Sequence, residues 1–181
     1  EGGVFADAAE AFSQMGRAMV IGIILVYVVM VVSMRSLITP FVIVLTLPLA
    51  FIGALGALFI TERALGLPAL IGLLMLIGLV VTNAIVLLSF VEKLRRDGMS
   101  VYDSLIEGGR ARIRPILMTA FTTSFALLPL AVTVSEGGII SAELATVVIG
   151  GLATSTFLTL VIIPAIYSLL RRDRQVFSQD G

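Results

Sequence analysis

The side chains that could do chemistry in this 181-residue chain are hydroxyls and one amide, all in apolar surroundings. Thr82 and Asn83 are neighbours, and Thr119, Thr122 and Thr123 have the three- and four-residue spacing that puts side chains on one helix face. The chain has no Cys and no His, which excludes thiol catalysis, Ser–His dyads, zinc sites of the HExxH type and His-ligated haem within it. We therefore expect no enzymatic activity, no metal site and no cofactor.

The composition indicates a protein of the membrane. Apolar residues make up 59% of the chain and charged residues 13%, against roughly 45–50% and about 25% in soluble domains. The mean hydropathy is +1.13, so too little polar surface exists to cover a soluble core. The 12 basic and 12 acidic residues cancel, and no global positive field favours nucleic acid as a partner. Membrane lipids are the expected surroundings.

Five stretches without charge are long enough to cross a bilayer, which takes about 20 residues of helix. Soluble buried helices would give runs of roughly 10–14 residues, and barrel strands would alternate polar and apolar residues. The sequence therefore predicts an all-α membrane protein with a bundle of five transmembrane helices. The stretches are 18–34, 36–61, 64–91, 115–135 and 144–170.

The basic residues predict the orientation. If the five stretches are successive crossings, ten Lys and Arg residues lie on one side and two, Arg17 and Arg63, on the other. The positive-inside rule places the cation-rich side in the cytoplasm. We expect a multi-pass protein of the cytoplasmic (inner) membrane, with its N-terminus outside and its C-terminus in the cytoplasm. The ten are Arg35, Lys93, Arg95, Arg96, Arg110, Arg112, Arg114, Arg171, Arg172 and Arg174.

The same topology divides the chain into expected regions. Residues 1–14 are expected to end an exported region, because the chain starts outside without a signal segment of its own. Residues 15–170 form the bundle, with a cytoplasmic loop at 92–114, and residues 171–181 form a cytoplasmic tail. Within the loop, Ser100 and Asp103 predict the start of a short amphipathic helix on the inner membrane face. Gly108 and Gly109 are expected to end it.

No Asp, Glu, His, Lys or Arg lies inside the predicted spans, so this chain cannot by itself move protons through such groups. Asn83 and Thr123 each lie eight residues from the predicted cytoplasmic boundary, about 12 Å deep, on successive antiparallel spans. They could form a polar seam that faces titrating groups supplied by the rest of the protein. Alternatively, the hydroxyls bond carbonyls of their own helices and Asn83 holds two helices together.

Small residues predict where helices approach each other closely. We expect packing surfaces at Gly53 and Ala57 in the second span, Gly72 and Gly78 in the third, and Gly150 and Gly151 in the fifth. Pro48, Pro129 and Pro164 fall inside spans and are expected to kink them.

Three strings resemble the C-terminal membrane segment of resistance-nodulation-division (RND) efflux permeases, in the hydrophobe/amphiphile exporter branch. They are IGLLMLIGLVVTNAIVLLSF, GGRARIRPILMTAFTTSFALLPLAV and GGIISAELATVVIGGLATSTFLTLVIIPAIYSLL. The resemblance implies a fragment of a twelve-helix pseudo-symmetric transporter: its last five helices, preceded by exported porter domains. It further implies a homotrimer that uses the proton motive force to export drugs and other amphiphiles, with a periplasmic adaptor and an outer-membrane channel as possible partners.

The resemblance also implies site residues. The family's Lys–Asn pair falls on Thr82 and Asn83, its Thr after the RPILM string falls on Thr119, and its preceding basic residue falls on Arg112. Thr82 departs from the pattern, because a neutral hydroxyl cannot pair electrostatically with a carboxylate. Arg112 has a simpler alternative role, reaching for lipid headgroups. Alternative functions of the chain are a related lipid exporter or protein-export accessory and a non-transporting membrane anchor.

Overall fold

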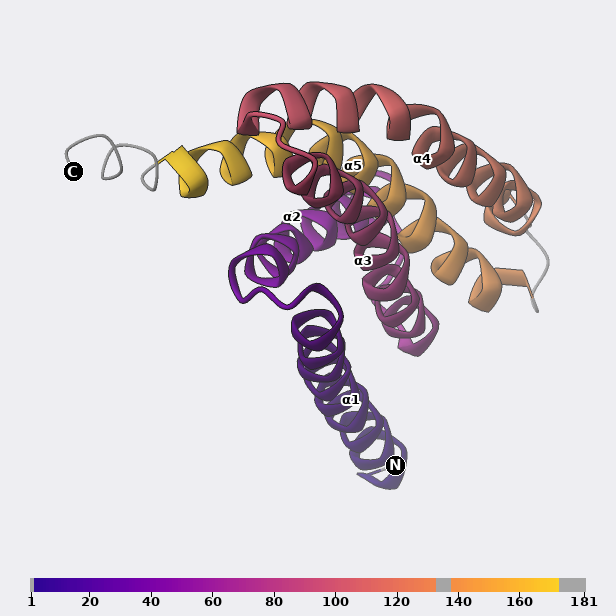
Figure 1. Ribbon diagram of the computed structural model, residues 1–181. Coiled ribbons are helices and arrows are strands. Elements are labelled where there is room, and N and C mark those ends of the chain that lie inside the picture. The colour runs from indigo at the N-terminus through magenta and orange to yellow at the C-terminus, as the bar shows by residue number, and fades with distance from the viewer. Residues whose placement is uncertain (1, 133–137, 173–181) are drawn as a thin grey trace.

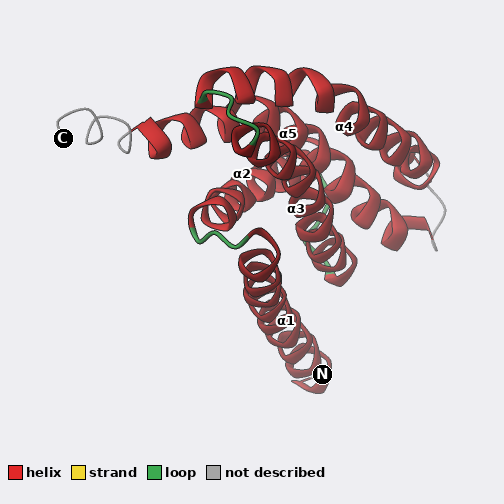
Figure 2. Ribbon diagram, viewed as in Figure 1, coloured by secondary structure: helices red, strands yellow, loops and turns green. Residues whose placement is uncertain are grey.

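The computed structural model describes residues 2–132 and 138–172, and within them every regular element is a helix (Figure 2). The helices are α1 (Gly2–Met34), α2 (Ile38–Ile60), α3 (Leu67–Arg96), α4 (Val101–Val132) and α5 (Gly138–Arg172). Each is long and apolar enough to cross a membrane. The predicted all-α bundle of five transmembrane helices is therefore confirmed, one helix for each charge-free stretch.

The interior of the bundle is built around α5 (Figure 1). Helix α5 packs against α2, α3 and α4, whereas α1 projects from the other helices and packs mainly against α2 and α3. Contacts between named residues give the directions: Gly53 and Ala57 of α2 meet Thr154 and Gly150 of α5 in antiparallel order. Helix α3 meets α5 in parallel order, as successive crossings in alternating directions require.

A constant offset relates α3 to α5. Gly72 lies against Val147 and Gly151 against Leu76, and Glu92 accepts a hydrogen bond from Tyr167. Each partner on α5 stands 75 positions after its partner on α3, so the two helices stay in register over most of their length.

Helix α1 is one uninterrupted helix of 33 residues. At 1.5 Å per residue it is about 50 Å long, against a hydrocarbon thickness of about 30 Å. The first span is therefore continuous with residues 2–14, which we expected to end an exported region. Arg35, at φ +48°, takes the left-handed conformation that closes many helix C-termini.

The connection between α3 and α4 is shorter than predicted, because helices occupy most of residues 92–114. Gly98 adopts φ +96° and lets Met99 N–H donate to the Leu94 carbonyl across the end of α3. Ser100 Oγ then accepts a hydrogen bond from Asp103 N–H, at 3.1 Å, and caps α4. The predicted start of the amphipathic helix at Ser100 is thus confirmed.

The predicted end of that helix at Gly108 and Gly109 is wrong, because α4 runs through both glycines and through Pro115 to Val132. Gly108 serves packing instead of termination: a Cβ at this position would collide with the side chain of Val91 on α3. The ribbon of α4 changes direction partway along (Figure 1). Pro115 has no N–H to donate to the carbonyl of Ala111, which weakens the helix there.

Five of the six predicted packing residues lie at helix contacts. A Cβ on Gly53 would overlap Thr154, and one on Gly150 would overlap Ala57. Gly151 lies against Leu76, and Gly72 against Val147. Gly78 has no neighbour within 4 Å of its Cβ position among the described residues, so its face of α3 is open.

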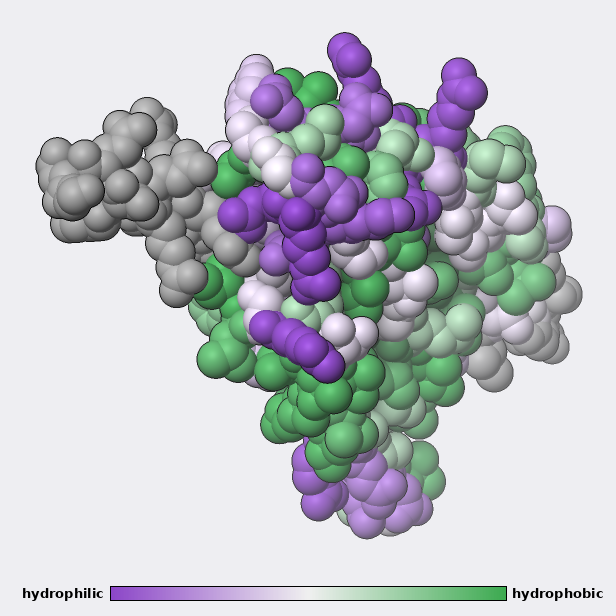
Figure 3. All heavy atoms as spheres, in the orientation of Figure 1, coloured by the Kyte–Doolittle hydropathy of each residue, from purple (hydrophilic) through white to green (hydrophobic). Residues whose placement is uncertain are grey.

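The surface is consistent with a membrane environment. On the face in Figure 3, hydrophilic residues gather at the N-terminal end of α1 and around the α3–α4 connection, and apolar residues cover the surface between them. Many large apolar side chains are exposed, including Ile24, Leu25, Phe41, Phe121 and Phe157. Such a surface needs hydrocarbon or further protein to cover it.

Candidate functional site

Two neighbouring polar residues of α3 point to different sides of the helix. Asn83 is 7% exposed, and its amide nitrogen has no hydrogen-bond partner among the described residues. Thr82 is exposed and donates to the carbonyl of Gly78, at 2.8 Å. The Thr82 hydroxyl is thus satisfied within its own helix, whereas the buried Asn83 amide has an unused donor whose burial costs free energy.

The threonines of α4 lie mostly on its surface. Thr119 and Thr122 are exposed and Thr123 is half-buried. Thr119 donates to the carbonyl of Pro115, at 3.0 Å, which is the carbonyl of the preceding helical turn. No hydrogen bond joins Asn83 to these threonines within residues 2–132.

The contacts between α3 and α4 set the level of Asn83. Gly108 packs on Val91, and the guanidinium of Arg112 lies over the ring of Phe90, at 4.8 Å from its centre. Extended along the two antiparallel helices, these pairs put Asn83 level with the stretch from Ile116 to Thr119. Equal depth in the membrane predicts that Asn83 pairs with Thr123, which lies about one turn further along α4.

Arg112 packs against a neighbouring helix. Its guanidinium covers an aromatic ring, a contact that is favourable by about 0.5–2 kcal/mol. Its Nε is buried and has no hydrogen-bond partner in the part of the chain that the structure describes. Arg112 thus combines a packed position with an unused donor.

An open stripe of small and polar residues runs along α3. Thr82 lies between Gly78, which has open space at its Cβ position, and Ser89, which is exposed. Their spacings of four and seven residues place them on one side of the helix. Met75 continues the stripe toward the N-terminal end of α3 and is 49% exposed. We call these four residues the α3 stripe.

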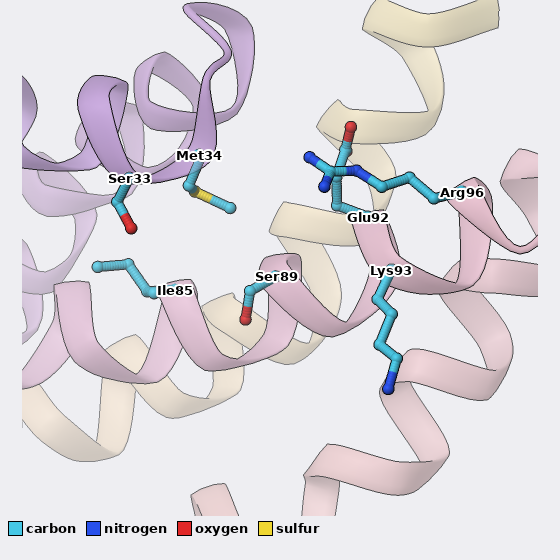
Figure 4. A pocket seen from close by; sticks show the side chains of 7 residues that line it. All are labelled: Ser33, Met34, Ile85, Ser89, Glu92, Lys93 and Arg96. Atoms are coloured by element: carbon cyan, nitrogen blue, oxygen red, sulfur yellow. The ribbon is translucent and has the colours of Figure 1, made fainter.

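A cavity of about 220 Å³ opens at the C-terminal end of the α3 stripe (Figure 4). Ser33 and Met34 of α1 face Ile85 and Ser89 of α3 across it. Three charged residues of α3, Glu92, Lys93 and Arg96, line the same cavity, and Lys93 is directed away from α1. The α3 stripe thus runs from the apolar middle of α3 to the charged residues at its C-terminal end.

Sequence reasoning missed a hydrogen-bonded cluster between α3 and α5. Tyr167 is fully buried, and its hydroxyl donates to Glu92 Oε2, at 2.7 Å. Arg95 donates to the same hydroxyl at 3.1 Å and lies 3.9 Å from Glu92. The only signal in the sequence is a tyrosine near the C-terminal end of the fifth apolar stretch. The predicted topology puts it on the same side of the membrane as the charged residues that follow the third stretch.

Removing the hydroxyl tests what this cluster contributes. Tyr167→Phe is expected to lower the free energy of unfolding by about 1–3 kcal/mol, because Glu92 and Arg95 lose a buried partner at once. Unfolding of the detergent-solubilised protein, followed by circular dichroism, measures it. Tyr102→Phe is the matched control, since Tyr102 is 72% exposed, and an equal effect of both variants would contradict the prediction.

Arg63 has a role that the sequence did not reveal. The turn after α2 places Glu62 at φ +53° and lets Arg63 N–H donate back to Leu58. The Arg63 guanidinium then donates to the carbonyls of Ala131, at 2.6 Å, and Ala142, at 2.8 Å, and to the Thr146 hydroxyl. One side chain thus joins the α2–α3 connection to the end of α4 and the start of α5.

Comparison with known proteins places this arrangement in a family. The sequence profile of the AcrB/AcrD/AcrF family matches residues 2–171. The chain is 46% identical over 175 residues to the swarming motility protein SwrC of Bacillus subtilis. It is 36% identical over 182 residues to the multidrug resistance protein MdtC of Proteus mirabilis. It is also 33% identical over 171 residues to the cobalt-zinc-cadmium resistance protein CzcA of Cupriavidus metallidurans.

This chain spans only a small part of the length of each relative that it matches. These alignments cover 94–98% of this chain but only 16–18% of the relatives. A crystal structure of a heavy metal efflux pump matches with a TM-score of 0.83 and 32% identity, over 93% of this chain and 16% of the pump. The ordered match of sequence and of five helices confirms the resemblance to RND permeases. This chain therefore belongs to the AcrB/AcrD/AcrF family of RND efflux permeases and corresponds to a segment of such a permease.

Proposed function

We propose that the chain is a membrane segment of a proton-driven exporter of drugs and other amphiphiles. The rest of that protein would supply the titrating acids, seven further helices and the exported porter domains. Placement in the inner membrane, assembly as a homotrimer, and work with an adaptor and an outer-membrane channel belong to the same proposal. The function is transport, with no chemical step on the cargo.

The α3 stripe is the observation that carries this proposal. Thr82, Gly78 and Ser89 leave an open polar face on a helix whose opposite side is buried, and the predicted spans hold no acid or base. Polar groups in a bilayer normally face protein or a water-filled path. A relay on another helix that approaches the α3 stripe would find a hydroxyl at Thr82, which can both donate and accept a hydrogen bond without carrying charge.

The proposal is tested by removing both hydroxyls in the full-length protein. Thr82→Ala together with Thr119→Ala is expected to lower drug export and the coupled proton uptake by about a hundredfold, the size of a lost proton-transfer partner. Fluorescent-drug efflux and a pH-sensitive dye in proteoliposomes measure the two rates.

Thr61→Ala is the matched control, because Thr61 is also exposed and also donates to the carbonyl of the preceding turn, that of Ala57. Unchanged export and uptake in the double variant would show that the hydroxyls are structural only. If the wild-type protein exports nothing, the chain belongs to a non-transporting anchor.

Export of metal cations is a second candidate. It is favoured by the 33% identity to CzcA and by the 0.83 TM-score against the heavy metal efflux pump. Zinc, cobalt and cadmium uptake into inverted vesicles, compared with uptake of a cationic dye, separates the two candidates. Transport of metal with no transport of dye would replace the amphiphile proposal.

A further inference from the structure

An open groove runs along the contact between α4 and α5. Its upper part is a hollow of about 380 Å³ beside Arg110, Ile113 and Pro164. Its lower part is a hollow of about 270 Å³ beside Phe121 and Phe157. Leu160 lines both hollows, so they adjoin each other at this residue, and together we call them the α4–α5 groove.

The groove lies away from the polar face of α4. Each helical residue turns the direction of the side chain by about 100°, so Thr119 points almost opposite to Leu117 and Phe121, two residues away on either side. The proposed function turns the Thr119 side toward the rest of the protein. The side that carries the groove is then left to the lipid, and this step rests on the proposed function.

The part of the groove that lies within the predicted span matches one leaflet. Along α4 the groove extends from Tyr102 to Ser124, and its part within the membrane runs from the level of the boundary cation Arg114 to Ser124. Eleven residues of helix span about 16 Å, close to half of the hydrocarbon thickness of about 30 Å. A single acyl chain in the cytoplasmic leaflet covers that depth.

The charge at the groove selects the headgroup. Arg110 is the one charged side chain among the described residues that line the groove, and it lies about one helical turn from Arg114, where cations mark the predicted cytoplasmic boundary. The walls below it are apolar, with Leu117, Phe121, Phe157 and Leu160 among them. A cation above an apolar channel complements a phosphate above a hydrocarbon chain.

We propose that the α4–α5 groove binds an anionic phospholipid of the cytoplasmic leaflet, with its phosphate at Arg110 and one acyl chain between Phe121 and Phe157. The lipid fills a space that the helices leave open.

Thr156 offers a check on the nature of the occupant. It lines the lower part of the groove, is 4% exposed, and its hydroxyl has no hydrogen-bond partner in the described part of the chain. A hydrocarbon chain offers this hydroxyl no hydrogen-bond partner, whereas a polar ligand would offer one. Replacing Thr156 with valine, of nearly equal shape, therefore leaves the binding of an acyl chain unchanged and weakens that of a polar ligand.

The experiment places a fluorescent reporter in the groove. The printed sequence has no Trp, so Phe121→Trp and the control Met118→Trp each add one, and the spectrum of the parent protein is subtracted. Both positions are exposed on α4, 60% and 68%, but only Phe121 lines the groove. The proteins are placed in phosphatidylcholine vesicles with a minor fraction of phosphatidylglycerol brominated on its acyl chains, since bromine quenches tryptophan on contact.

We expect the groove reporter to be quenched well beyond the control. Arg110→Gln is expected to lower its preference for brominated phosphatidylglycerol over brominated phosphatidylcholine by about fivefold, the effect of one cation near an anionic surface. Arg114→Gln, on the same helix but outside the groove, is expected to change it little. Thr156→Val is expected to leave the quenching unchanged.

Three results would overturn the proposal. Equal quenching of the Phe121→Trp and Met118→Trp variants would mean that the tryptophan senses only bulk lipid. Because the bulkier ring at position 121 could itself close the groove, Phe157→Trp on the opposite wall is measured as a second groove reporter. An equal effect of Arg110→Gln and Arg114→Gln removes the headgroup site. Weaker quenching in Thr156→Val points to a polar occupant. Since none of these readouts measures export, they are independent of the transport test.

Discussion

Gly150→Leu is expected to separate α2 from α5 and to destabilise the protein by about 3 kcal/mol or more. A single Cβ at Gly150 already overlaps Ala57, and the carbonyl of Gly53 lies 3.2 Å from the same position. The obstruction is backbone and a short side chain on α2, neither of which can turn aside. The leucine therefore forces the two helices apart along the contact on which the bundle interior depends.

Gly56→Leu is the matched control, because Gly56 lies on α2 but has nothing within 4 Å of its Cβ position. We expect it to be neutral or slightly stabilising, since leucine is a better helix former than glycine. Thermal unfolding in detergent, followed by circular dichroism, gives both values. If both variants unfold at the same temperature, the close α2–α5 approach contributes nothing to stability.

Arg63→Ala is expected to cost about 3 kcal/mol of stability, the second large effect. The guanidinium donates to the carbonyls of Ala131 and Ala142 and to the hydroxyl of Thr146. Hydrogen bonds from a charged group contribute about 1.5–3 kcal/mol each, and the partial exposure of Arg63 reduces their sum. Ala131 lies in the last turn of α4, where carbonyls have no donor from their own helix.

Arg63→Lys separates charge from geometry. Lysine keeps the charge but cannot reach two helix ends with a planar fork, so we expect it to recover less than half of the loss. Arg17→Ala is the control, because Arg17 is also a cation of the predicted outer side but has its only described hydrogen bond within α1, to Ser13. Limited proteolysis at the α2–α3 connection gives a local readout besides unfolding. Unchanged protection in Arg63→Ala would contradict the role.

Hydropathy and charge predicted the fold closely, because crossing a bilayer constrains length and composition more than sequence detail. The five charge-free stretches became α1 to α5, and the small residues at Gly53, Ala57 and Gly150 marked a true helix contact. Local helix signals served less well. Gly108 is typical of a helix end, but its contact with Val91 makes it part of a helix interior.

The candidate site was predictable in its residues but not in its contacts. Sequence identified Thr82, Asn83 and Thr119, and only coordinates show that the hydroxyls bond their own helices while the Asn83 amide is left buried. Tyr167 and Arg63 escaped notice for a physical reason. Their partners lie 75 and 79 residues away in sequence, and no periodic pattern encodes such pairings.

The common offset between α3 and α5 limits how the protein can move. To slide by one turn, about 5.4 Å, Leu76 would have to leave the notch at Gly151 and meet Val147 or Ser155, whose side chains occupy that space. The Tyr167–Glu92 bond would break in the same step. The two helices therefore move as one rigid unit, which can tilt within the bundle but whose helices cannot slide along each other.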